Sequence, residues 1–95
     1  MIADFASLGL ETVPTRLAGN SDYAPFEAVG IAVGGASTGW ASLKTEEEAE
    51  IFGGQAGEAH DPCYHQSCDD LTNVDLEAME AVVKVMASAV ERYAY

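Results

Sequence analysis

The strongest constraint on the fold is a run of large apolar side chains near the C-terminus, spaced alternately three and four residues apart. Its members are Leu76, Met79, Val83, Met86, Val90 and Tyr93. This spacing places them on one face of an amphipathic helix, which we expect to run from residue 75 to 93. Asn73 or Asp75 can cap its first turn. We expect the apolar face to be buried, with both methionines as core residues.

Upstream of this helix, the sequence predicts an α/β fold with one parallel βαβ unit. Residues 10–17 and the glycine-bounded apolar run 31–35 are typical of strands, and residues 23–29 of a short connecting helix. Strands joined in this way lie parallel, with a right-handed crossover. Shorter helical segments are expected at residues 2–9 and near residues 46–52.

Two parallel strands are too few for an independently stable sheet, and a parallel sheet needs cover on both faces. The visible elements cannot supply that cover. We therefore expect the chain to be a fragment of a larger α/β domain, or to complete its sheet by self-association.

The chain is strongly acidic, with sixteen Asp and Glu residues against four Lys and Arg and a formal net charge of −12. This balance argues against nucleic acid and anionic membrane surfaces as partners. The first residues lack the basic start and long apolar stretch of a signal peptide, so we expect any export signal to lie outside this sequence.

Possible chemistry is concentrated in the run DPCYHQSCD, residues 61–69. Its cysteines, Cys63 and Cys68, are the only two in the chain. They could form a short-range disulfide, or hold a metal with His65 and a fourth ligand such as His60. The disulfide is favoured because zinc sites usually contain two closely spaced ligand pairs, and a second pair is missing.

Within this run, His65 and Tyr64 are the candidate functional side chains. A lone loop histidine is usually a surface residue, but His65 could also serve as a metal ligand or a base. Tyr64 could donate a hydrogen bond to a developing oxyanion.

The DPCYHQSCD run resembles the C-terminal signature of the secreted zinc aminopeptidases of the M28 family, especially the Streptomyces-type leucyl aminopeptidases. The resemblance extends over nearly the whole chain, because further short segments follow the order and spacing of the family. These segments are SDYAPF at 21–26, AVGI at 28–31, and the shorter pieces at 34–35, 38–39, 44–45, 53–54 and 56–57.

The resemblance implies that residues 1–95 are the C-terminal part of a peptidase domain with a three-layer αβα fold. The complete enzyme would be extracellular and would use two zinc ions to remove N-terminal residues from peptides. His65 matches a zinc ligand of the family and Tyr64 matches the tyrosine that stabilises the tetrahedral intermediate. Cys63 and Cys68 match its disulfide.

The resemblance also indicates what the chain lacks. The family's other zinc ligands and its general base have no counterpart here, so we expect the chain to be inactive alone and to require the missing N-terminal segment. Gly19, Asn20 and Ser37 fall at the border of the substrate pocket. Because Asn20 and Ser37 depart from the family pattern, we do not assign the family's preference for large apolar N-terminal residues to this chain.

The alternative hypothesis is a non-catalytic binding module built on the CYHQSC loop and stabilised by a disulfide or a zinc ion.

Overall fold

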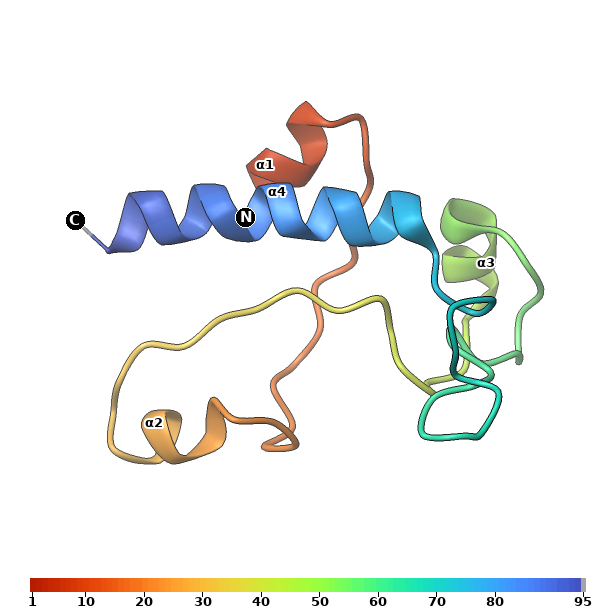
Figure 1. Cartoon of the computed structure of the whole chain (residues 1–95), viewed down its shortest axis with the longest axis horizontal. Coiled ribbons are helices and arrows are strands. Elements are labelled where there is room, and N and C mark those ends of the chain that lie inside the picture. Colours follow the sequence, from red (N-terminus) through yellow and green to blue (C-terminus); the bar gives the residue numbers. More distant parts are fainter. Residues whose placement is uncertain (95) are drawn as a thin grey trace.

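A computed structural model describes residues 1–94, which contain four helices joined by long irregular segments (Figure 1). The helices are α1 (Ile2–Ser7), α2 (Ala24–Ala28), α3 (Glu46–Phe52) and α4 (Leu76–Tyr93). In Figure 1, α1 lies along the middle of α4, α3 lies near the N-terminal end of α4, and α2 sits at the far end of a long excursion. The arrangement is open and is organised around one long helix.

Helix α4 confirms the helix predicted from the apolar spacing, to within one residue. Of the two predicted caps, Asp75 is the one used: its Oδ1 accepts hydrogen bonds from the backbone N–H groups of Glu77 and Ala78, both 3.0 Å long. These bonds satisfy two of the donors that a helix N-terminus leaves free. Asn73 takes a different role, described below.

The prediction of which α4 face is buried was wrong for this chain. The buried side chains are Val85 and Ala89, at 1% and 7% exposure, whereas Val83 is 60% exposed. Residues two apart on a helix point to nearly opposite sides, because each residue advances the helix by about 100°. Helix α1 therefore covers the side opposite the large apolar residues. The exposed members of that face are Leu76, Met79, Val83, Met86, Val90 and Tyr93.

An ion pair joins the two packed helices. The Arg92 guanidinium donates one hydrogen bond to each carboxylate oxygen of Asp4, at 3.1 and 2.7 Å. Paired donors of this kind match carboxylate geometry well. The hydrogen bonds from Arg92 hold the pKa of the Asp4 carboxyl well below its usual range.

The predicted parallel βαβ unit is not formed. Its connecting helix is present as α2, but residues 10–17 and 31–35 form no strand within the described part of the chain. The β-type backbone pairing among residues 1–94 is one isolated antiparallel bridge, between Leu43 and Ala59. The physical reason is that an extended segment needs neighbouring strands for its backbone groups and an apolar layer for its side chains. Here Leu10, Val13 and Ile31 remain substantially exposed.

The segment that precedes the candidate site is better organised. In α3, Thr45 Oγ1 accepts from the Glu48 N–H at 3.1 Å and Glu48 Oε2 accepts from the Thr45 N–H at 2.8 Å, which is a capping box. Residues 42–44 and 57–60 run antiparallel, with the Lys44 N–H donating to the Glu58 carbonyl at 2.8 Å. The two sides of this segment thus support each other just before residue 61.

No helix among residues 1–94 is both long and apolar enough to cross a bilayer.

Candidate active site

Residues 61–69, called the site loop below, start at a backbone connection to Trp40. The Asp61 N–H donates to the Trp40 carbonyl at 2.7 Å. The Asp61 carboxylate then accepts from the Cys63 N–H at 2.9 Å. This short-range bond stabilises a turn in the backbone around Pro62, a residue that has no N–H of its own.

A disulfide closes the middle of the site loop. Cys63 and Cys68 are joined with their Cα atoms 5.3 Å apart. Inside this ring, the Gln66 N–H donates to the Cys63 carbonyl at 2.8 Å. Because both sulfur atoms are engaged, the alternative in which the cysteines act as thiolate zinc ligands does not describe this structure.

The disulfide ring carries Tyr64 and His65, whose side-chain rings stack on each other. The ring centroids are 3.9 Å apart and the planes are inclined by 17°. Tyr64 is half-buried and His65 is exposed. His65 has φ = 56°, in the left-handed region that is uncommon for residues other than glycine. Such backbone conformations concentrate at functional sites, where surrounding structure holds them in place.

A residue of the following turn joins the two ends of the site loop. The Asn73 side-chain amide donates to Asp61 Oδ1 at 3.0 Å and to Asp69 Oδ1 at 3.1 Å. From the sequence alone, Asn73 is a candidate helix cap, and this bridge was not predicted. The available signal was its position between the acidic end of the site loop and the Asp75 cap.

The site loop does not build a complete metal centre by itself. No group of three or more His, Cys, Asp or Glu residues suited to a metal is found among residues 1–94. His60, considered above as a fourth ligand, is engaged elsewhere: its Nδ1 lies 2.9 Å from the Ser42 carbonyl oxygen, and its Nε2 lies 3.9 Å from Glu48 Oε2. A catalytic zinc uses about three protein ligands plus water, so residues 1–94 do not complete such a site by themselves.

The three residues assigned to the substrate-pocket border are exposed and engaged locally. The Gly19 N–H donates to the Tyr23 hydroxyl at 2.6 Å, and that hydroxyl lies 3.3 Å from Asn20 Oδ1. Ser37 Oγ accepts from the Gly39 N–H at 3.0 Å. Among residues 1–94, these hydrogen bonds do not join Gly19, Asn20 or Ser37 to Tyr64 or His65.

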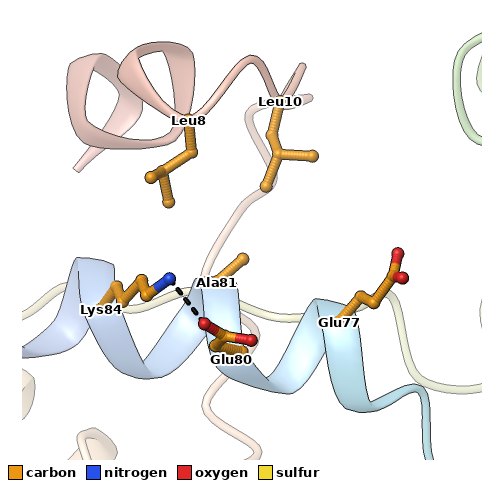
Figure 2. Close-up of a pocket in the computed structure, with 6 residues that line it drawn as sticks. All are labelled: Leu8, Leu10, Glu77, Glu80, Ala81 and Lys84. Carbon is orange, nitrogen blue, oxygen red and sulfur yellow. Dashed lines mark ion pairs between the residues drawn. The ribbon is translucent and has the colours of Figure 1, made fainter.

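The larger of the two cavities described lies between the end of α1 and the side of α4, and has a volume of about 210 Å³. Figure 2 shows Leu8 and Leu10 above Ala81, with an ion pair between Lys84 and Glu80 at its edge. None of its lining residues belongs to the site loop, so this open space is not the candidate active site.

Comparison with known proteins decides the family. The family model described as Peptidase family M28 matches residues 6–90. The chain belongs to peptidase family M28. The M28 chain is also similar to several named proteins. An aminopeptidase from Pseudomonas aeruginosa is 45% identical over 85 residues, which is 90% of this chain.

Two further relatives come from a fungus and from another bacterium. A probable leucine aminopeptidase 2 from Aspergillus fumigatus is 44% identical over 95% of this chain. Leupeptin-inactivating enzyme 1 from Streptomyces exfoliatus is 42% identical over 90% of it. The M28 chain spans 16–20% of the length of these three relatives.

Proposed function

We propose that residues 1–95 are the C-terminal part of an M28 aminopeptidase domain that removes N-terminal residues from peptides. The observation that supports this most strongly is the stacked Tyr64–His65 pair carried on the Cys63–Cys68 ring. The relatives named as aminopeptidases support the reaction class. The acidic composition and the disulfide suit an extracellular enzyme.

In this proposal, His65 supplies one ligand to a zinc centre that the rest of the domain completes. Its exposed imidazole leaves a ring nitrogen accessible to a metal from outside this chain. When bound, zinc would supply Lewis-acid polarisation of the scissile carbonyl and an activated water. The disulfide ring and the stacked tyrosine limit how far the imidazole can turn, which favours a fixed ligand direction.

Tyr64 has a separate role in the proposal. Its hydroxyl donates a hydrogen bond to the oxygen of the substrate carbonyl as negative charge develops there. A fixed donor aimed at that position stabilises the transition state more than the ground state. Stacking against His65 places this donor beside the proposed ligand.

The proposal requires a partner segment, and two features of the chain support that requirement. The large apolar face of α4 is exposed, with Val83 at 60% and Val90 at 62%. Residues 10–17 and 31–35 have strand-like composition and no pairing among the described residues. The remainder of the peptidase domain would cover the apolar face of α4 and would pair with the two strand-like segments. Self-association of the chain is the other way to supply this cover and pairing.

The test is a chimera in which residues 6–90 replace the matching segment of the Pseudomonas aminopeptidase. We expect the isolated chain to show no hydrolysis of a leucine chromogenic amide with added zinc, and the chimera to be active. In the chimera, His65→Ala should remove most activity, and Tyr64→Phe should slow turnover by roughly 10²-fold, the usual loss for one oxyanion donor.

Two results would count against this function. A folded chimera that binds peptides without hydrolysing them would favour the binding-module alternative. Chelator-sensitive turnover by the isolated chain, abolished by His65→Ala, would refute the claim that the remainder of the domain is needed.

A further inference from the structure

One side-chain amide connects the start and the end of the site loop. Asn73 Nδ2 lies 3.0 Å from Asp61 Oδ1 and 3.1 Å from Asp69 Oδ1. The backbone of Asn73 is itself held, because its N–H donates to the Asp70 carbonyl at 2.9 Å. The amide is therefore attached to the chain just beyond the loop that it bridges.

The chemistry of this bridge suits asparagine specifically. A side-chain NH₂ group has two hydrogens and can donate one to each of two acceptors. Asp61 and Asp69 are acceptors of like charge, which would repel each other without a donor between them. Donation to both oxygens also fixes which end of the amide faces the loop.

The two bridged carboxylates lie just outside the disulfide. Asp61 is two residues before Cys63, and Asp69 directly follows Cys68. The disulfide closes the ring that carries Tyr64 and His65. The Asn73 bridge joins Asp61 and Asp69, the two residues that flank this ring. The Cys63 N–H also donates to the same Asp61 oxygen that receives the amide, so one oxygen atom links the bridge to the backbone of the first cysteine of the disulfide.

We propose that Asn73 is a positioning residue for the Tyr64–His65 pair, and that its amide and the Cys63–Cys68 bond stabilise each other. This inference rests on the proposed function for its catalytic meaning, but not for its test. Holding the loop ends together raises the effective concentration of one thiol near the other. By linkage, if the Asn73 bridge favours formation of the disulfide, then the disulfide favours formation of the bridge by the same factor.

The experiment uses the 95-residue chain equilibrated in glutathione redox buffers, with the disulfide fraction measured by acid quench and mass spectrometry. Asn73→Asp keeps the side-chain shape, removes both donors and adds a third negative charge. We expect the equilibrium constant for the disulfide to fall about tenfold, because hydrogen bonds to carboxylates are lost. A tenfold fall corresponds to a reduction potential about 30 mV higher. Asn73→Ala, which adds no charge, should shift it in the same direction by less.

A second readout follows the Tyr64–His65 stack directly. In the oxidised chain, NMR should show the His65 ring protons shifted upfield by the Tyr64 ring, and Asn73→Asp should reduce that shift. Thr72→Val is the matched control, because Thr72 Oγ1 donates to Asp70 Oδ1 at 2.6 Å, in the same turn but outside the bridge. Thr72→Val should change the disulfide equilibrium constant by less than about twofold and should leave the His65 ring-proton shift as in the parent chain. This is the result expected for a hydrogen bond that does not link the loop ends.

An unchanged disulfide equilibrium or an unchanged ring shift in Asn73→Asp would overturn the proposal, provided that circular dichroism shows α4 intact. If Asn73→Asp loses α4, the same two criteria apply to Asn73→Ala. The proposed catalytic function fails by a different result, namely an active chimera carrying His65→Ala, so the two failures are distinguishable.

Discussion

The exposed face of α4 provides a paired mutational test of the claim that this chain needs the rest of a domain. Val83 and Val85 are identical residues on nearly opposite sides of one helix, 60% and 1% exposed respectively. We consider Val83→Asp and Val85→Asp, each made in the isolated chain and in the chimera with the Pseudomonas aminopeptidase. Valine and aspartate have similar helix propensities, so the comparison reports on burial.

The expected magnitudes follow from these exposures. Fully burying a valine side chain contributes about 1.5–3 kcal/mol. Because Val83 is 60% exposed in the isolated chain, its substitution there loses only about 0.6–1.2 kcal/mol of this burial term. Val85→Asp loses the whole term and also buries an unpaired charge, which costs several kcal/mol more. In the chimera, covering the large apolar face should raise the cost of Val83→Asp to at least about 3 kcal/mol.

The assay is urea unfolding followed by far-ultraviolet circular dichroism; in the isolated chain α4 is the longest helix that contributes to this signal, and in the chimera the signal follows unfolding of the whole domain. Val85→Asp should be severely destabilising in both proteins, whereas Val83→Asp should be severe only in the chimera. If Val83→Asp costs the chimera no more than it costs the isolated chain, the large apolar face is not covered by the rest of the domain. The inference that the chain is incomplete would then lose its strongest structural support.

Three further outcomes are expected. Mass spectrometry of the unreduced chain should show the cysteine pair of the site loop two hydrogens lighter than the dithiol, and two freely alkylated thiols in native protein would contradict this. Because Arg92 lowers the pKa of the Asp4 carboxyl, Asp4 should stay ionised and α1 docked as the pH falls through the usual aspartate range. Helix α1 should separate from α4 only in stronger acid, and Arg92→Gln should move this separation to higher pH. If NMR titration of the α1 amides gives the same midpoint for the parent chain and for Arg92→Gln, the ion pair is excluded. Gly39 has φ = 98° and a Cβ there would meet the His60 ring, so Gly39→Ala should increase amide exchange across residues 40–60; unchanged exchange would show that the contact is not close.

The sequence predicted the local features of the fold well. The alternating spacing of three and four defined α4 almost to the residue, and an acidic run after Thr45 indicated α3. Both depend on interactions within a few residues, which are present whether or not the rest of a domain surrounds them. The same is true of the site loop, where proline, cysteine spacing and short-range hydrogen bonds act together.

The failures concern long-range partners. Periodicity shows that Val83 and Val90 share a face with the other large apolar residues, but it does not show whether this chain contains anything to cover that face. Residues 10–17 and 31–35 have strand-like composition, yet strand pairing requires neighbours that the described chain does not supply. The Asn73 bridge was missed for a related reason, because it depends on the loop bringing Asp61 back to within reach of residue 73.

The central claim is that His65 supplies a zinc ligand to a site completed by the rest of an M28 domain. Zinc content per chain, measured by inductively coupled plasma mass spectrometry on the purified chimera, tests it directly. We expect two zinc ions in the chimera, as in two-metal hydrolases, about one fewer with His65→Ala, and no loss with Tyr64→Phe. A chimera carrying His65→Ala that keeps its full zinc content would contradict the assignment of His65 as a ligand.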